Sequence, residues 1–262
     1  MYHVTHSVKV DKVSKVVVAS ADTDVFIVLV HNYGKWLKMD LKELWCICGT
    51  GSTKKAVPIH ILYSTLGPDI AHILPALHAV SGTDTTPKVG TKSCALRTVK
   101  RIGPNLLKTF GIEQLNEDMM VSTEKFMVGF FTDSSEICTF DQLRHEFYYK
   151  NKKSLNLKTF PPTSNSIRTH IKLSYLQTYR WVNAAWLEDF NNLDPLSYGY
   201  VNVVDENILK PDVITEKLPP DFPVPCICLK CARDTVCPCR VKEIKCSAYC
   251  KCRREEMCRN PH

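Results

Sequence analysis

The sequence lacks a hydrophobic run long enough to cross a lipid bilayer. Its longest apolar stretch, Val25–Val30, is far shorter than the roughly 20 residues that a membrane-spanning helix needs. The segment Met1–Lys15 is polar, with scattered histidines and lysines, and so lacks the apolar centre of a secretory signal peptide. These absences predict a protein that has no membrane partner, is not secreted, and works in the nucleus or the cytoplasm.

Acidic residues are fewer than basic residues. The 262 residues contain 34 Lys and Arg against 27 Asp and Glu, which gives a formal net charge of +7. A basic balance favours an anionic partner, and nucleic acid is the commonest one for a protein that is not secreted. The apolar content of 44% excludes a disordered tail and allows one ordinary domain with a small appendage.

The first half of the chain alternates strand and helix patterns. The β-branched segment Val13–Ser20 predicts a buried strand, and the apolar run Val25–His31 predicts a buried helical turn or short helix. Residues 35–48 offer one or two further strands. Pro58 and Pro68 are each placed to open a helix, the first ending near Leu66 and the second near Val80. This alternation favours an α/β layered core.

The second half is mainly helical up to a proline-rich segment. Residues 82–111 predict helices joined by glycine- and proline-marked turns. A later helix, capped by Ser164 or Asn165, carries an apolar stripe typical of a core-facing helix. The stripe is formed by Ile167, Ile171, Tyr175, Tyr179, Val182 and Trp186. Five prolines between Asp205 and Pro225 predict an extended linker.

Nine of the thirteen cysteines are concentrated in residues 226–262 with the spacing of metal ligands. They are Cys226, Cys228, Cys231, Cys237, Cys239, Cys246, Cys250, Cys252 and Cys258. Thiolates prefer zinc, and structural zinc takes four ligands in a tetrahedron. Nine sulfurs supply the twelve ligand positions of three ions when three sulfurs bridge, whereas two separate four-cysteine sites would leave one thiol unused. The arithmetic favours a shared cluster.

The C-x-C, C-x3-C-x-C and C-x-N elements of residues 226–262 resemble the tesmin-type CXC domain, a cysteine-rich DNA-binding module. The resemblance implies about three structural zinc ions. It also implies DNA contacts by Lys245, Tyr249, Lys251 and Arg253. The spacing departs from the family pattern after Cys228 and after Cys252. A structural zinc knot or a protein-docking surface is the alternative interpretation of this segment.

Three aspartates stand where metal ligands often lie in α/β folds. Asp22 and Asp24 follow the first predicted strand, and Asp84 ends an apolar segment in the sequence Ser-Gly-Thr-Asp. Clustered carboxylates are the hard oxygen ligands with which Mg²⁺ is held for phosphodiester hydrolysis. The alternative is that these aspartates cap helices.

The order of elements over residues 13–105 resembles the PIN-like fold of the flap endonuclease family. The resemblance implies that Asp22, Asp24 and Asp84 are catalytic Mg²⁺ ligands. It implies that Lys88, Gly90 and Lys92 belong to a turn that grips the nucleic-acid backbone, DNA in preference to RNA. In flap-type nucleases an acidic pair lies on a helix upstream of this strand. That pair has no counterpart here, because Asp11 is the only acidic residue before Asp22. We therefore expect a nuclease-like core that is incomplete at its N-terminus.

Three other motifs predict structural roles. The segment Gly49–Lys55 lacks the spacing of a phosphate-binding loop and predicts a hairpin turn. His60, His72 and His78 lie on an apolar helical stretch without a suitably spaced acidic partner, which is typical of core or interface histidines. The C-x-C pair at residues 46 and 48 falls within a predicted strand and is expected in the core.

These patterns together predict an α/β, PIN-like layered domain with a helical extension and a zinc-stabilised tail. The expected divisions are 1–111 for the core, 112–204 for the helical region, 205–225 for the linker and 226–262 for the cysteine module. The leading hypothesis is a nucleic-acid-binding protein with a degenerate or truncated nuclease-like domain, which if active cleaves structured DNA with Mg²⁺. The alternatives are a non-catalytic DNA-binding scaffold and a zinc-stabilised protein-interaction module. The chain also resembles a group of animal proteins that join such a domain to a cysteine-rich tail, for which descent from a mobile element is one interpretation.

Overall fold

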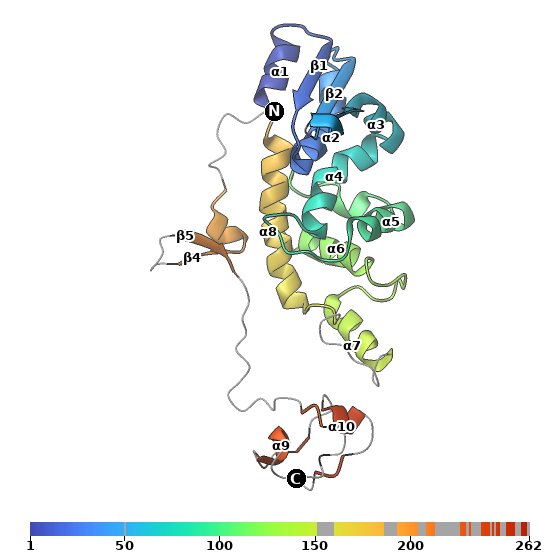
Figure 1. Cartoon of the computed structure of the whole chain (residues 1–262), viewed down its shortest axis with the longest axis vertical. Helices are drawn as coiled ribbons and strands as arrows, with labels where there is room; N and C mark the ends of the chain where they lie inside the picture. The colour runs from blue at the N-terminus through green and yellow to red at the C-terminus, as the bar shows by residue number, and fades with distance from the viewer. Residues whose placement is uncertain are drawn as a thin grey trace. The chain divides into compact units, whose positions relative to one another are not determined.

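A computed structural model shows a mixed α/β protein in which helix predominates (Figure 1). It describes residues 1–49, 51–150, 160–185, 193–203 and 208–212, and within the tail 226–228, 231, 237–241, 243, 245–246, 250–254 and 258–260. The chain divides into two compact units. Unit 1 comprises Met1–Leu143 and Pro162–Val213, and unit 2 comprises Arg144–Pro161 and Ile214–His262. Among the described residues, no helix combines the length and apolar character that crossing a membrane requires.

The secondary structure consists mainly of helices. The α-helices are α1 (Tyr2–Lys9), α2 (Thr23–Leu37), α3 (Ile59–Leu66), α4 (Pro68–Ser81), α5 (Lys92–Ile102), α6 (Glu117–Val128), α7 (Phe140–Lys150), α8 (Ser164–Asn183), α9 (Pro238–Val241) and α10 (Lys251–Arg254). The 3₁₀ turns are η1 (Gly51–Thr53), η2 (Asn105–Leu107) and η4 (Pro195–Tyr198). The strands are β1 (Lys15–Ala19), β2 (Glu43–Cys48), β3 (Lys55–Pro58), β4 (Tyr200–Val203) and β5 (Ile208–Pro211).

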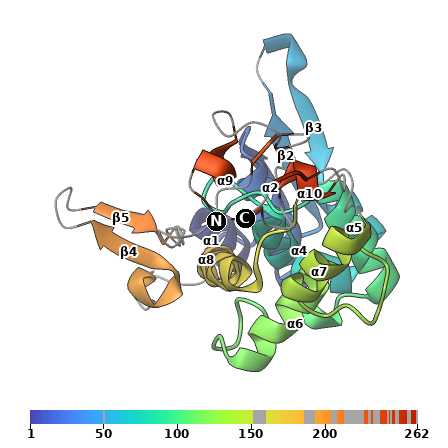
Figure 2. The same ribbon diagram turned by 90° about the horizontal axis from the view of Figure 1, so that it is seen from below.

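The first three strands form one small sheet in the order β1-β2-β3. β1 pairs in parallel with β2, with Val17 opposite Trp45, and β2 pairs antiparallel with β3. A parallel pair needs a crossover connection, which α2 supplies. β2 and β3 form a hairpin (Figure 2). The predicted hairpin turn at Gly49–Lys55 is therefore confirmed. The strand predicted at Val13–Ser20 is present as β1, but the prediction that it is buried is wrong, because its residues alternate between exposed and half-buried.

Helix α2 is longer than the sequence predicted, and it changes the interpretation of residues 35–48. The apolar face continues past His31, because Tyr33 and Trp36 follow Leu29 at helical spacing and are buried with it. The Trp36 indole N–H also donates to Thr5 Oγ1 of α1 at 3.0 Å. As a result residues 35–37 are helical, and residues 35–48 contribute one strand.

The proline-marked helix starts are close to their predicted places. Pro58 immediately precedes α3, and Pro68 is the first residue of α4. The N-cap of α8 is Thr163, one residue before the predicted cap Ser164. The hydroxyl of Thr163 accepts the backbone N–H of Ser166 at 3.2 Å. Its stripe is buried at Ile167, Ile171, Tyr175 and Val182, whereas Trp186 lies outside the described residues.

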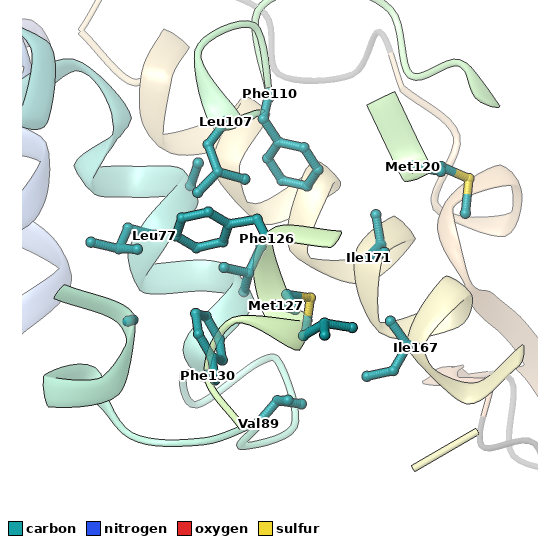
Figure 3. Close-up of a cluster of buried hydrophobic side chains, with 14 of the residues drawn as sticks. Leu77, Val89, Leu107, Phe110, Met120, Phe126, Met127, Phe130, Ile167 and Ile171 are labelled. Atoms are coloured by element: carbon teal, nitrogen blue, oxygen red, sulfur yellow. The ribbon is translucent and has the colours of Figure 1, made fainter. Parts of the chain in front are cut away.

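Two apolar cores hold unit 1 together. One lies between the sheet and helices α2 and α3 and includes Leu29, Trp36 and Leu44, all fully buried. The other joins α4, α6 and α8. Figure 3 shows Phe126 of α6 extending toward Leu77 of α4 within this second core. Helices α6 and α8 therefore share a core with residues 73–110.

A second hairpin occupies part of the segment expected to be linker. β4 and β5 pair antiparallel, with Tyr200 opposite Pro211, and η4 contacts α8 before the hairpin (Figures 1 and 2). Residues 208–211 are therefore strand, which corrects the prediction for them. Pro211 is tolerated because it ends its strand and has no N–H to leave unpaired. The rest of the predicted linker, except Asp212, lies outside the described residues.

The second core makes a stability prediction. Phe126→Ala should lower the free energy of unfolding by about 3–5 kcal/mol, because it removes a fully buried ring and leaves a cavity. Val121→Ala on the same helix removes a half-exposed side chain and should change it by less than about 1 kcal/mol. Urea denaturation of both variants measures the difference, and equal losses would contradict the assignment of this core.

Candidate functional site

The structure brings the three predicted aspartates to one cleft. Asp22 and Asp24 stand at the start of α2, and Asp84 follows the end of α4. Lys92, the first residue of α5, lines the same cleft, whose volume is about 500 Å³. Apolar side chains complete its wall, among them Ile27, Leu74, Leu77, Ala95 and Leu96.

Asp22 has a structural function in addition to its place at the cleft. Its side chain caps α2 by accepting the backbone N–H of Asp24 at 2.8 Å. The hydroxyl of Ser20 in turn accepts the Asp22 backbone N–H at 3.2 Å. A cap of this kind satisfies one of the unpaired N–H groups at a helix start. The Asp22 side chain remains exposed, so its carboxylate is accessible from solvent.

Asp24 has a partner that the sequence did not indicate. Nε2 of His78, in the last turn of α4, lies 3.0 Å from Oδ1 of Asp24. Burial lowers the pKa of His78 and the charge of Lys92 lowers it further, whereas Asp24 acts to raise it. The His78 ring also packs against Trp181 of α8, with ring centroids 5.5 Å apart. The expectation that His78 has no acidic partner is therefore wrong, because the fold joins residues 54 positions apart.

The ammonium of Lys92 is directed toward the backbone of unit 1. It donates to the carbonyl oxygen of His78 at 2.8 Å and also to that of Gly82. Burial lowers the pKa of Lys92 to about 8, and the opposing charge of Asp24 limits the shift. Lys92 thus links the start of α5 to the backbone at the end of α4. Gly82 is required between the two helices because its φ is +106°, and a Cβ there would lie 2.5 Å from Cα of Lys88.

The other members of the predicted backbone-gripping turn divide between surface and core. Lys88 is exposed in the segment between α4 and α5. Gly90 instead faces Phe130 of the second core, because a Cβ at Gly90 would lie 3.1 Å from the ring atom Cδ2. Asp84 is exposed at the rim of the cleft. Asp84, Lys88 and Lys92 are all exposed charged side chains of this segment.

The cleft does not contain a compact metal cage. Among the described residues, the only groups with three or more potential ligand atoms within 4.8 Å of one another are made of cysteines. The three aspartates line one cleft without approaching that closely. A cation at this place would draw Asp22, Asp24 and Asp84 together, since Mg²⁺ demands near-ideal octahedral geometry.

The tail cysteines gather into a buried cluster in unit 2. Three groups of four thiols could each hold a metal ion. The groups are Cys226, Cys231, Cys237 and Cys246; Cys226, Cys239, Cys246 and Cys250; and Cys231, Cys246, Cys252 and Cys258. Cys226 and Cys231 belong to two groups and Cys246 to all three. The sequence arithmetic predicted three bridging sulfurs among nine cysteines. The three groups instead use eight cysteines, and Cys246 belongs to all three.

The sulfur spacing fits metal coordination. Cys226 Sγ lies 3.4 Å from that of Cys231 and 3.8 Å from that of Cys252, and Cys231 Sγ lies 3.7 Å from that of Cys246. The edge of a tetrahedron with Zn–S bonds of 2.3 Å is about 3.8 Å. A disulfide would bring two sulfurs to about 2.05 Å. All thirteen cysteines are free thiols, and the clustered thiols of the tail could hold a metal ion such as zinc.

Cys228 is the one tail cysteine outside these three groups, although burial and the neighbouring thiol of Cys237 raise its pKa. Burial and then Cys250 raise the pKa of Cys239 to about 12. Thiols this crowded ionise together only when a cation compensates their charge. Asn260 Nδ2 donates to Cys246 Sγ at 3.3 Å, which supports the most widely shared sulfur.

Of the four tail residues predicted to contact DNA, the structure describes the side chains of two. Lys245 is exposed. Lys251 is half-buried at the start of α10, and its backbone N–H donates to the carbonyl oxygen of Cys226 at 2.9 Å. Tyr249 and the side chain of Arg253 lie outside the described residues.

Comparisons with protein-family models, with curated proteins and with solved structures find no match to this chain. The geometry of the cleft and of the cysteine cluster is therefore the basis for a functional conclusion.

The cysteine cluster makes a prediction about metal content. The purified chain should carry about three zinc ions, and Cys246→Ser should lose most of them, because Cys246 belongs to all three groups. Cys138→Ser is the matched control, since Cys138 is a free thiol of unit 1 outside those groups. Elemental analysis of both variants measures the zinc. Equal zinc in Cys246→Ser and Cys138→Ser would contradict the shared cluster.

The Asp24–His78 contact makes a prediction about ionisation. Asp24→Asn should lower the pKa of His78 further, because the carboxylate is the group that raises it. Asp69→Asn, an exposed position at the start of α4, should leave it unchanged. The chemical shift of the imidazole Cε1 proton followed against pH reports both. A His78 pKa that rises or stays constant in Asp24→Asn would rule out the contact.

Proposed function

We propose that the chain is a nucleic-acid-binding protein with a Mg²⁺-dependent nuclease-like site in unit 1 and a zinc-stabilised, DNA-contacting module in unit 2. One observation carries the first part. Asp22, Asp24 and Asp84, from two segments about sixty positions apart, line a single cleft together with Lys92. A cleft that combines carboxylates with a cation is suited to a divalent ion and a phosphodiester.

The roles within the cleft follow from exposure and contacts. Asp22 and Asp84 are exposed, and their carboxylate oxygens would be the ligands of a Mg²⁺ ion in this cleft. His78 fixes the orientation of the Asp24 carboxylate. Mg²⁺, when bound, supplies neutralisation of the phosphate charge and acidifies the attacking water. Lys92 adds positive charge to the same wall, and its pKa of about 8 keeps it mostly protonated at neutral pH.

Charge and metal binding support a role for unit 2 in contacting nucleic acid. Residues 226–262 contain nine Lys and Arg against four Asp and Glu, an excess sufficient for salt-dependent phosphate contact. A metal-thiolate cluster gives such a short segment a rigid scaffold that it could not obtain from an apolar core. On this proposal DNA is preferred to RNA, and the protein works in the nucleus.

A non-catalytic DNA-binding scaffold is the second candidate, and a specific observation favours it. Two of the three aspartates already have structural partners, since Asp22 caps α2 and Asp24 pairs with His78. In that case the cleft is a remnant of a catalytic site, and nucleic-acid affinity resides in the basic surface and the cysteine cluster.

Cleavage of branched and single-stranded DNA by the full chain, with and without Mg²⁺, tests the proposal. We expect Mg²⁺-dependent cleavage that Asp84→Ala lowers by about 100-fold, because a metal ligand is lost. Asp118→Ala, an exposed aspartate in the first turn of α6, is the control and should retain full activity.

The alternatives give different results. Salt-sensitive DNA binding that persists without cleavage and collapses on zinc chelation would establish the non-catalytic scaffold. No measurable nucleic-acid affinity even at low salt would leave unit 2 as a protein-interaction module and overturn the proposal.

A further inference from the structure

Strand β1 lies at an edge of the first sheet, because the strand order is β1-β2-β3. Successive side chains of a strand point to opposite faces. Val16 and Val18 pack against the core between the sheet and α2, whereas Val17 lies on the opposite face with 53% of its surface exposed. β1 therefore combines a free edge with an apolar side chain that faces solvent.

The hydrogen bonds of the flanking residues show which backbone groups of β1 face β2. The carbonyl oxygen of Ser14 accepts the backbone N–H of Glu43 at 3.0 Å, and the N–H of Ser20 donates to the carbonyl oxygen of Ile47 at 2.9 Å. In a parallel ladder every second residue bonds to the same neighbouring strand. The even-numbered residues from 14 to 20 therefore direct their backbone groups to β2.

The odd-numbered residues direct their backbone N–H and C=O groups to the free edge. They are Lys15, Val17 and Ala19. Within the part of the chain that the structure describes, no hydrogen bond joins these backbone groups to a further segment. A row of unpaired backbone donors and acceptors is a template for an additional strand.

β1 lacks the features that protect most edge strands from pairing. Edges are commonly blocked by a proline, a bulge or a charge in the middle of the strand. The sequence of β1 is Lys-Val-Val-Val-Ala, and its register with β2 is continuous. Its one charged residue, Lys15, stands at the end and pairs with Glu43 of its own chain at 2.9 Å. The edge is thus open to a further strand.

We propose that β1 pairs with β1 of a second copy of this chain, antiparallel about a two-fold axis at Val17. The register centred on Val17 is the one that pairs all three outward residues of each strand. Val17 then lies opposite the partner's Val17, and Lys15 lies opposite the partner's Ala19. A two-fold axis makes this contact closed, so it yields a dimer and not a fibre.

The distribution of charge along β1 selects a second copy as the occupant. With the lysine at one end and the small alanine at the other, antiparallel pairing places no like charges opposite each other and brings valine against valine. In-register parallel pairing would instead place Lys15 beside the partner's Lys15. The half-buried Trp45 lies next to Val17 on the same face, so the dimer continues one apolar row across both sheets.

The size of the contact sets the expected affinity. One pair of strands with a single row of side chains buries less surface than a standard stable interface, so we expect a dissociation constant on the order of 10 μM. The inference does not rest on the proposed function, because no residue of β1 lines the acidic cleft.

Sedimentation equilibrium of the full chain, with zinc and a reducing agent present, tests the inference up to about 100 μM protein. We expect a monomer–dimer equilibrium. Val17→Lys places two lysines opposite each other across the axis and should weaken the dimer by about tenfold or more. Val121→Lys makes the same change at a half-exposed position of α6 and should leave the dimer intact.

Amide hydrogen exchange of the unmodified chain locates the contact without any substitution. The amides of residues 15, 17 and 19 should become protected as the protein concentration rises. A monomer at every concentration would leave the free edge to a strand from a different protein and would overturn the inference. A dimer that Val17→Lys and Val121→Lys affect equally, or one that leaves these three amides unprotected, would overturn it as well.

Discussion

Helix α2 has to bury apolar side chains from Val28 to Trp36, and the position of the acidic cleft at its start follows from that requirement. Leu29, Val30 and Trp36 are completely buried between the sheet and the neighbouring helices. Once α2 is fixed in this way, its first turn presents Asp22 and Asp24 at one end and its last turns present Lys35 and Lys38 at the other. Charge is therefore sorted along a single helix, acidic at its start and basic at its end, as the helix dipole favours.

Unit 2 depends on a different source of stability. Its buried cluster, within the residues that the structure describes, is made of cysteines and not of aliphatic or aromatic side chains. Sulfur atoms that lie 3.4–3.8 Å apart gain little stability from burial alone. Each thiol must also lose its proton to become a strong metal ligand. The geometry could hold a metal ion, and if the segment binds one, losing it would remove much of the stabilisation of its fold.

The sequence predicted those features that local chemistry determines. Each of these features depends on a short segment of the sequence. They are the β-branched run of β1, the prolines before α3 and within the first turn of α4, the stripe of α8 and the clustering of the tail cysteines. Pairings between distant residues were not accessible in this way. The contact of His78 with Asp24 leaves no periodic or spacing signal.

The sequence also did not predict where some helices and strands begin and end. The apolar face of α2 continues through Trp36. Because polar residues stand between its apolar positions, the sequence did not indicate that the helix extends this far. Strand β5 was not predicted because it contains Pro211. A proline is compatible with a hairpin when it stands at the end of the strand, as Pro211 does. The PIN-like and CXC-like identities remain predictions, since resemblance in motif order is not a geometric observation.

The position of Cys246 in all three thiol groups has a consequence for how unit 2 assembles. A sulfur that serves several ions gains full value only when all of them are present, so partly loaded intermediates are penalised relative to the empty and the complete cluster. If all three groups hold ions together, assembly would be cooperative, and the segment would change between two states over a narrow range of free metal. The tail would register metal supply as a threshold, and not as a graded occupancy.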